Sequence, residues 1–287
     1  DIQAMQNTNP IQPTRPVSKI FSILKKMADK GNPESQYRYG CLLKEGKEIT
    51  QDYEEAAKYF KLSADQNYLD AIVEYAVCLK DGIGIEKNET EAFNLMKKAV
   101  NENDTEAIIT LANWYTELRP RKYGLAYELY KRADANGYPD ASALIGSLME
   151  KKKLGTIATP EEIMKYYEKS CHLGSSVGMY HMATFYHYGI GVKTNIQEAI
   201  RLYNLATFIY DQNRSSAIFS LSVLYEEIKD FENCLEIVDF YRNQDMFVGY
   251  VRSYDLYLNG IGVEKDEEKA KEFLEIARDG LVLFYAL

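Results

Sequence analysis

The sequence predicts an all-α fold of about seven helix–turn–helix repeats stacked in a row. Three loops have nearly the same sequence, and each follows an apolar pattern with helical spacing. A second helical pattern follows each loop. Because this combination recurs every 32 to 39 residues, one repeat is one pair of helices. The three loops are residues 82–88, 189–195 and 260–266.

The first helix of each repeat is marked by a small residue, six positions before its loop in the three clear repeats. Laying this register over the chain gives one anchor per repeat, and six of the seven anchors are Gly, Ala or Ser. Residues this small let two helices approach closely. Tyr254 is the exception, so the packing of the last repeat is expected to differ. The anchors are Gly40, Ala76, Ala112, Gly146, Ala183, Ser222 and Tyr254.

The second helix of each repeat carries two anchors seven positions apart, which places both on one face of the helix. Several of these helices begin with a capping signal, an Asn or Thr followed three positions later by Glu, as at Asn88, Asn195 and Thr159. The anchor pairs are Ala57 and Ala64, Ala92 and Ala99, Ala126 and Ala133, Ile163 and Ser170, Ala199 and Ala206, Cys234 and Tyr241, and Ala270 and Ala277.

The two ends of the array differ from its middle. Residues 1–16 are rich in Gln, Asn, Thr and Pro, which predicts a flexible arm or linker. Residues 18–30 match a second helix alone, so the array, which spans 17–280, begins with half a repeat. The apolar residues 281–287 are expected either to cap the end of the stack or to begin a further repeat.

Composition excludes several classes of protein. The 287 residues carry 34 basic and 43 acidic side chains, a net charge of −9, which argues against nucleic acid as a partner. No stretch approaches the roughly 20 apolar residues of a transmembrane helix. The four cysteines are too widely spaced for a zinc or redox motif, which favours reduced thiols and a cytoplasmic location. A secreted or ER-lumenal location stays open, because the sequence begins at Asp1 rather than Met.

The repeat of about 36 residues, with the three glycine loops, resembles the Sel-1-like repeat family, which is related to the tetratricopeptide repeats. The resemblance is specific in the repeats that contain Gly82, Gly189 and Gly260. It is looser where residues 118–124 replace the loop and where residues 151–158 are inserted. It implies a right-handed α–α superhelix whose first helices line a concave groove, and a role as scaffold or adaptor.

The candidates for chemistry are weak. No GxGxxG or GxxxxGK[ST] motif accompanies the glycine loops, so they indicate structural turns rather than a phosphate site. His181 and His187 are six residues apart on one helix and point to opposite sides, which prevents them from sharing a metal ion. We therefore predict no enzymatic activity, metal or cofactor. The competing hypotheses are an enzyme site around Cys171, His181 and His187, and a carbohydrate or small-ligand site on the tyrosine-rich surface.

Tetratricopeptide geometry predicts that the groove is lined by first-helix positions −3, +1 and +4 from the anchors. The +4 positions change from basic at Lys44 and Lys80 to acidic at Glu226, which predicts a polarised groove. The expected partner-binding residues are Tyr37, Cys41, Lys44, Val73, Val77, Lys80, Ile109, Asn113, Tyr180, Thr184, His187, Phe219 and Glu226.

These patterns predict a non-catalytic scaffold or adaptor that binds a protein or peptide partner through its concave face, because stacked repeats present a long, rigid surface. The alternative is a regulatory or activating domain of an enzyme such as a kinase or synthase, in the same or another chain.

Overall fold

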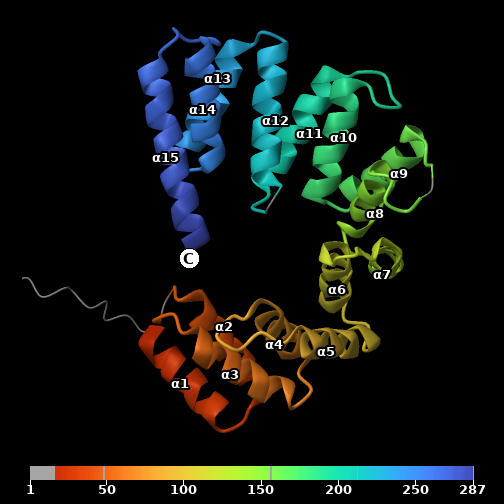
Figure 1. The fold of residues 1–287 in the computed structure, drawn as a ribbon, viewed down its shortest axis with the longest axis vertical. Coiled ribbons are helices and arrows are strands. Elements are labelled where there is room, and N and C mark those ends of the chain that lie inside the picture. The colour runs from red at the N-terminus through yellow and green to blue at the C-terminus, as the bar shows by residue number, and fades with distance from the viewer. Residues whose placement is uncertain (1–16, 48, 156, 212, 287) are drawn as a thin grey trace, which may run out of the picture. The chain divides into compact units, whose positions relative to one another are not determined.

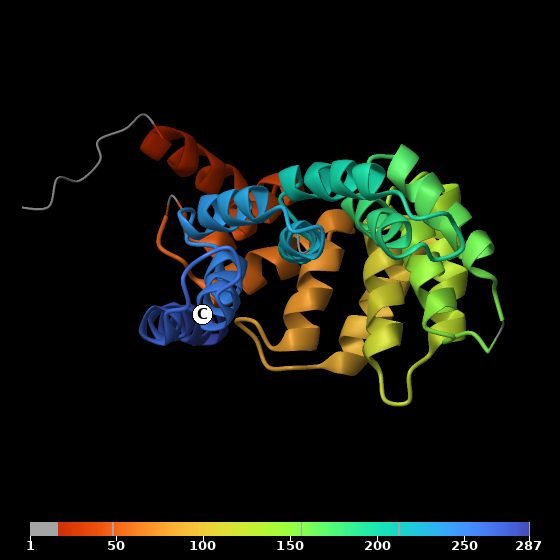
Figure 2. The ribbon, with the colours of Figure 1, turned by 90° about the horizontal axis from the view of Figure 1, so that it is seen from above.

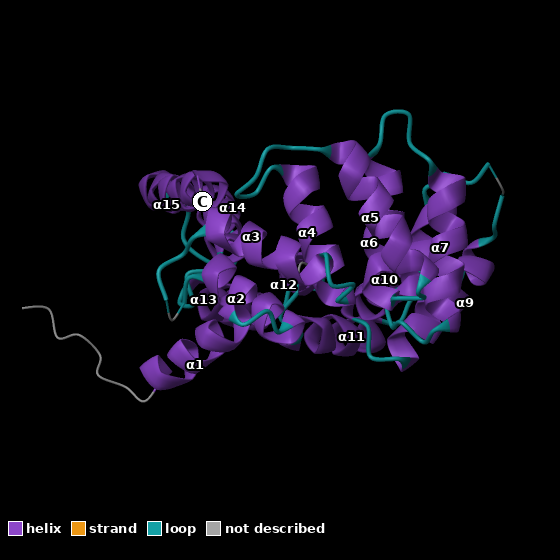
Figure 3. Cartoon of the chain, turned by 90° about the horizontal axis from the view of Figure 1, so that it is seen from below, coloured by secondary structure: helices purple, strands orange, loops and turns teal. Residues whose placement is uncertain are grey.

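The computed structural model describes residues 17–47, 49–155, 157–211 and 213–286, with side chains placed within Ile20–Arg278. The described residues form fifteen α-helices and no strand (Figure 1). Figure 3 shows that loops join helix to helix throughout. The chain divides into two compact units, Asp1–Trp114 and Tyr115–Leu287. The prediction of an all-α repeat fold is confirmed.

The first compact unit contains a single helix followed by helical hairpins. Within it, consecutive helices from α1 to α5 pack against one another. The helices are α1 (Val17–Asp29), α2 (Pro33–Glu45), α3 (Tyr53–Ala64), α4 (Leu69–Asp81), α5 (Glu89–Asn101) and α6 (Thr105–Glu117), whose last residues belong to the second unit.

The second compact unit continues the same pattern, and its consecutive helices lie side by side (Figure 2). The helices are α7 (Tyr123–Ala135), α8 (Ala141–Glu150), α9 (Pro160–His172), α10 (Ser176–Tyr188), α11 (Ile196–Phe208), α12 (Arg214–Glu227), α13 (Phe231–Arg242), α14 (Phe247–Asn259) and α15 (Glu267–Ala286). The even-numbered helices are the predicted first helices of the repeats. The odd-numbered helices from α3 onward are the second helices, and α1 is the half-repeat.

The predicted anchors lie where the helices meet. Ala76, Ala112, Ala183 and Ser222 are fully buried, since a residue without a long side chain leaves room for the facing helix. Tyr254 is only half-buried, which agrees with the expectation that the last repeat packs differently.

Each glycine loop performs two tasks. The first glycine ends the first helix in the left-handed conformation, with φ of 76° at Gly82 and 69° at Gly189. The second glycine also has a positive φ and lies against the start of the second helix of the preceding repeat, as Gly84 does at Tyr53. The loop therefore reverses the chain and also joins one repeat to the previous one.

The predicted capping signals are confirmed. The side chain of Asn88 accepts a hydrogen bond from the Glu91 amide at 3.1 Å, and this satisfies a helix N–H group that would otherwise lack a partner. Thr159 and Glu162 form a complete capping box at the start of α9.

The predictions for the two ends of the chain, a flexible arm at the start and a cap or further repeat at the end, stay predictions. The expected arm, residues 1–16, lies outside the described residues. The backbone of α15 continues as one helix to Ala286, whereas side chains beyond Arg278 lie outside the description. No helix in the described part of the chain combines the length and apolarity that a membrane span requires.

Candidate partner-binding surface

A pocket of about 290 Å³ opens between three first helices of the second unit, α10, α12 and α14. The predicted residues Tyr180 and Phe219 line it, and both stand three positions before an anchor. Val251 contributes the equivalent position of the last repeat. The pocket is completed by Ser215, Ser216, Ser220, Phe247 and Val248.

Two aromatic rings in this pocket remain accessible. Phe219 is 39% exposed and Phe247 is 44% exposed. Phe247 was not predicted, although it stands one helical turn before Val251 on the same face of α14. Extending the predicted stripe by one turn toward the helix N-termini would have found it, together with Ser215 and Ser216.

A buried arginine contacts a residue of the pocket wall without lining the pocket itself. Arg252 on α14 bonds through Nη2 to Oε2 of Glu226 at 2.6 Å and through Nε to Oγ of Ser222 at 2.8 Å. Its guanidinium also lies 5.2 Å from the centre of the Phe219 ring. Arg252 therefore fixes both the predicted residue Glu226 and the ring that lines the pocket. Arg252 stands at a −2 position, outside the register from which the groove residues are predicted.

At three junctions, the +4 position of one repeat lies against the −2 position of the next. Lys44 Nζ lies 2.7 Å from Oε2 of Glu74, and Glu226 lies against Arg252 with the charges exchanged. Between them along the chain, Glu150 Oε2 lies 3.7 Å from His181 Nδ1. At Lys44 and Glu226, where the predicted change from basic to acidic begins and ends, the −2 position of the next repeat carries the opposite charge. A side chain held in such a pair is less available to a partner.

The predicted residues of the first unit lie on α2, α4 and α6. Tyr37 packs its ring 5.5 Å from that of Tyr68, and burial raises the pKa of its hydroxyl. Lys80 Nζ lies 5.3 Å from the centre of the Trp114 ring. Val73 and Ile109 are buried. The half-buried members of the set are Tyr37, Cys41, Lys44, Val77, Lys80 and Asn113.

Two further predicted residues, Thr184 and His187, lie on α10 and make polar contacts with other residues of the second unit. The Thr184 hydroxyl donates to the carbonyl of Tyr180 at 3.0 Å and lies 3.1 Å from the hydroxyl of Tyr203. His187 is buried, with Nε2 2.8 Å from Oε2 of Glu227. Contact of any member of the predicted set with a partner stays a prediction.

The residues of the competing enzyme hypothesis have separate surroundings. His181 stacks on Tyr167 with ring centres 4.4 Å apart, whereas His187 stacks on Tyr188. Burial raises the pKa of the Cys171 thiol, which disfavours the nucleophilic thiolate. Among the described residues, no group of three His, Cys, Asp or Glu side chains is placed to hold a metal ion.

The half-buried His181 predicts a pH dependence of stability. Burial lowers its pKa below the ordinary value, and the nearby Glu150 carboxylate offsets this only in part. The unfolded chain therefore binds a proton at a higher pH than the folded chain does. The contribution of neutral His181 is complete above about pH 6.5 and is lost as the pH falls toward the lower folded pKa.

We expect His181→Phe to reduce the loss of unfolding free energy between pH 7 and pH 5 by on the order of 1 kcal/mol. Denaturant unfolding at pH 5 to 8 measures this, and the wild-type and variant curves should run parallel above pH 7. Parallel curves over the whole range would contradict the assignment.

The sequence matches the family model described as Sel1 repeat at residues 33–68, 69–104, 176–207 and 247–280. These segments include the three repeats with the specific glycine loops, and the first full repeat. Comparison with curated proteins gives no match.

Two crystal structures share the fold. One is c5321, a protective antigen present in uropathogenic Escherichia coli strains displaying an SLR fold, with a TM-score of 0.62 and 23% identity over 90% of this chain. This chain covers 56% of c5321, a little over half of its length. The other is a Sel1 repeat protein from Oxalobacter formigenes, with a TM-score of 0.60 and 21% identity over 92% of this chain and 97% of that chain. The chain therefore contains four Sel1 repeats and shares the helical-repeat fold of these Sel1-repeat structures.

Proposed function

We propose that the protein is a non-catalytic scaffold or adaptor, and that the pocket between α10, α12 and α14 holds a segment of a protein partner. The observation that carries the proposal is the pair of accessible rings, Phe219 and Phe247, at the pocket wall. Aromatic residues in pockets are the usual anchors of protein interfaces. The pocket lies on regular helices, so little conformational freedom is lost when a partner binds.

The chemistry of the pocket indicates which part of a partner it binds. None of the described residues that line it is charged, and three of them are serines. A volume of about 290 Å³ suits an inserted side chain better than a drug-sized ligand, whose sites range from about 300 to 1,000 Å³. We infer that an apolar side chain enters between the rings while the serine hydroxyls bond to the peptide backbone of the partner.

Selection of random displayed peptides on the immobilised full chain, followed by fluorescence anisotropy, tests this function. We expect Phe219→Asp and Phe247→Asp each to weaken binding of the selected peptides at least about 10-fold, because a carboxylate would be buried against an apolar ligand. The matched control is Phe208→Asp on α11, where the ring is exposed and lies outside this pocket.

Circular dichroism verifies that each variant keeps its helices. Peptides that bind Phe219→Asp and Phe247→Asp as tightly as the wild type would refute the proposed site. A loss confined to Phe208→Asp would instead place recognition at the second helices.

A further inference from the structure

A cavity of about 770 Å³ in the second unit lies on the second helices rather than the first. It is bounded by α7, by α9 and by the inserted loop that follows α8. This volume is within the range of ligand-binding sites in proteins. The cavity is lined by Gly124, Tyr127, Glu128, Met149, Leu154, Ile157, Ala158, Glu162, Lys165, Tyr166 and Lys169.

The inserted loop brings apolar side chains to a place where water would otherwise meet them. Ile157 is 94% exposed, and Leu154 and Tyr166 are half-buried beside the cavity. An isoleucine with this exposure adds nothing to the core of the free protein. Its surface would be removed from water only by something that enters the cavity.

Three of the four charged side chains that line the cavity have a hydrogen-bond or ion-pair partner, and the fourth has none among the described residues. Glu128 is paired with Lys131 at 2.8 Å, and Lys169 is paired with Asp134 at 2.7 Å. The Glu162 carboxylate accepts the backbone N–H of Thr159. Lys165 forms no hydrogen bond or ion pair with any described residue.

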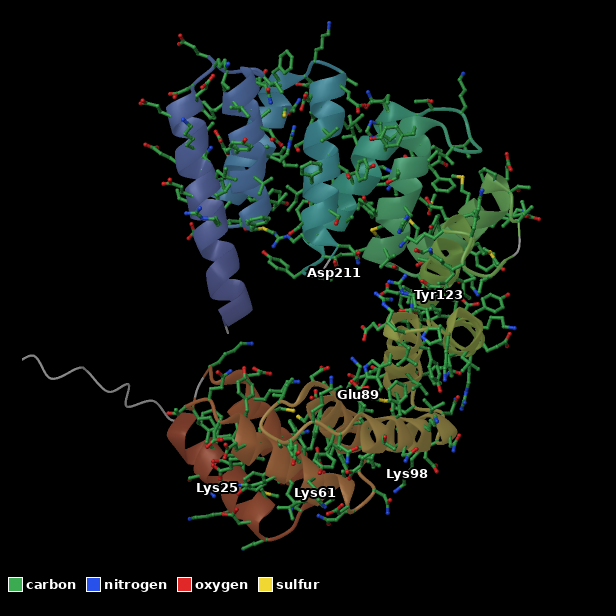
Figure 4. The ribbon with its side chains drawn as sticks, viewed as in Figure 1. Lys25, Lys61, Glu89, Lys98, Tyr123 and Asp211 are labelled. Carbon is green, nitrogen blue, oxygen red and sulfur yellow. The ribbon has the colours of Figure 1, made fainter. Side chains whose placement is uncertain are left out.

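Further positive charge comes from the inserted loop itself. Lys151, Lys152 and Lys153 are exposed, and none forms an ion pair in the described part of the chain. Lys153 Nζ lies 5.8 Å from the centre of the Tyr123 ring. Tyr123 is the first residue of α7 and is labelled in Figure 4. The side chain of Lys153 therefore crosses from the loop to α7, next to Gly124 in the cavity wall. In a chain of net charge −9, this cavity therefore combines apolar side chains with Lys165, which no described residue pairs, and with Lys153 beside its wall.

We propose that this cavity is a second docking site, which binds an acidic segment of a protein partner by taking up one bulky apolar side chain. The apolar side chain would cover Ile157 and Tyr166, and carboxylates on either side of it would pair with Lys165 and the loop lysines. The site goes beyond the proposed function, because it lies on different helices and prefers a charged partner. A scaffold with both sites would hold two partners at once.

An array of synthetic nonapeptides tests the proposal with the full chain. Each peptide has a central Leu, Phe or Trp flanked by Asp and Glu, and a matched set has Lys and Arg in the flanks. We expect the acidic set to bind selectively, and its affinity in fluorescence anisotropy to fall as salt is raised. Replacing the central residue by Ala should also weaken binding at least about 10-fold.

Variants locate the site. Lys165→Glu and Ile157→Asp should each reduce affinity for the acidic peptides at least about 10-fold, and both change exposed side chains, so the fold is retained. Lys271→Glu on α15 makes the same change of charge at an exposed position outside the cavity, and should leave the affinity within about twofold. Phe219→Asp should also leave it unchanged, which separates this site from the pocket on the first helices.

Three results would overturn the proposal. These are equal binding of acidic and basic peptides, no binding of any acidic peptide, and unchanged affinity in both cavity variants. A further arm uses vesicles of phosphatidylcholine with phosphatidylserine, and binding to these vesicles in the absence of peptide binding would show that Lys165 and the loop lysines recognise lipid instead.

Discussion

Replacing Gly84 by alanine is expected to lower the free energy of unfolding by about 3 kcal/mol, several times the effect of most surface substitutions. Gly84 has a φ of +66°, and a Cβ atom placed on it would stand 1.9 Å from the carbonyl oxygen of Tyr53. That oxygen belongs to the backbone at the start of α3, which cannot rotate away. Either the loop or α3 must move, and the contact between two repeats is weakened. Because a stack of repeats is stabilised by such nearest-neighbour contacts, the loss extends beyond the loop.

Gly82→Ala is the matched control, in the same loop. Gly82 also has a positive φ, of +76°, but the nearest atom to an added Cβ is 3.6 Å away on Lys87. We expect a loss of only about 1 kcal/mol, the cost of the left-handed conformation for alanine. Urea unfolding compares the two variants, and hydrogen exchange should show faster exchange of the amides at the start of α3 in Gly84→Ala alone. Equal destabilisation by the two substitutions would rule out the close approach as the cause.

The periodicity of the sequence was sufficient to predict the fold, because residues with the same packing role recur at equivalent positions of the repeats. Small anchors such as Ala76 and Ala183 recur where helices must approach, and the capping residue Asn88 marks where a helix begins. Where the pattern of one repeat is irregular, the equivalent positions of the other repeats still predict its helices. The second glycine of each loop was visible in the sequence as well, yet its contact with the preceding repeat required coordinates.

The candidate surface was less predictable, since exposure depends on which neighbours each side chain meets. Tyr180 and Phe219 were found through their register, and both line the pocket. Val73 and Ile109 have the same register but are buried. Phe247 lies one turn beyond the predicted stripe. The cavity beside Ile157 depends on an insertion, for which periodicity makes no prediction.

The charge pairs correspond to a second signal in the sequence, which lies at the −2 positions. The +4 positions alone, which change from Lys44 to Glu226, predict a charge gradient along a groove. Comparing the −2 positions as well gives Glu74 after Lys44 and Arg252 after Glu226, a reversal at both ends of the array. Such compensation between consecutive repeats predicts contacts across the interface of two repeats rather than contacts with a partner.

Replacing Arg252 by methionine is expected to lower the free energy of unfolding by roughly 2 to 3 kcal/mol, the second large effect. The Arg252 side chain is only 5% exposed, and its removal takes the ion-pair partner from the Glu226 carboxylate and one hydrogen bond from the Ser222 hydroxyl, which still donates to the carbonyl of Phe219. Loss of one member of a buried pair costs about 3 to 5 kcal/mol. The expected value is smaller, because Glu226 is 31% exposed and water solvates its charge in the variant.

The ion pair of Lys44 and Glu74 in the first unit is the control, because it has the same register but is more exposed to solvent. Glu74 occupies the same −2 position as Arg252, but its side chain is 22% exposed and that of Lys44 is 35% exposed. Glu74→Met should therefore cost about 1 kcal/mol or less, as expected for a solvated ion pair. A double-mutant cycle with Glu226→Gln isolates the coupling to Arg252 from the loss of packing against Phe219. If Arg252→Met and Glu74→Met had equal effects, burial would not be the cause. If the coupling energy were zero, the stability of the last repeats would depend on the packing of the arginine rather than on its charge.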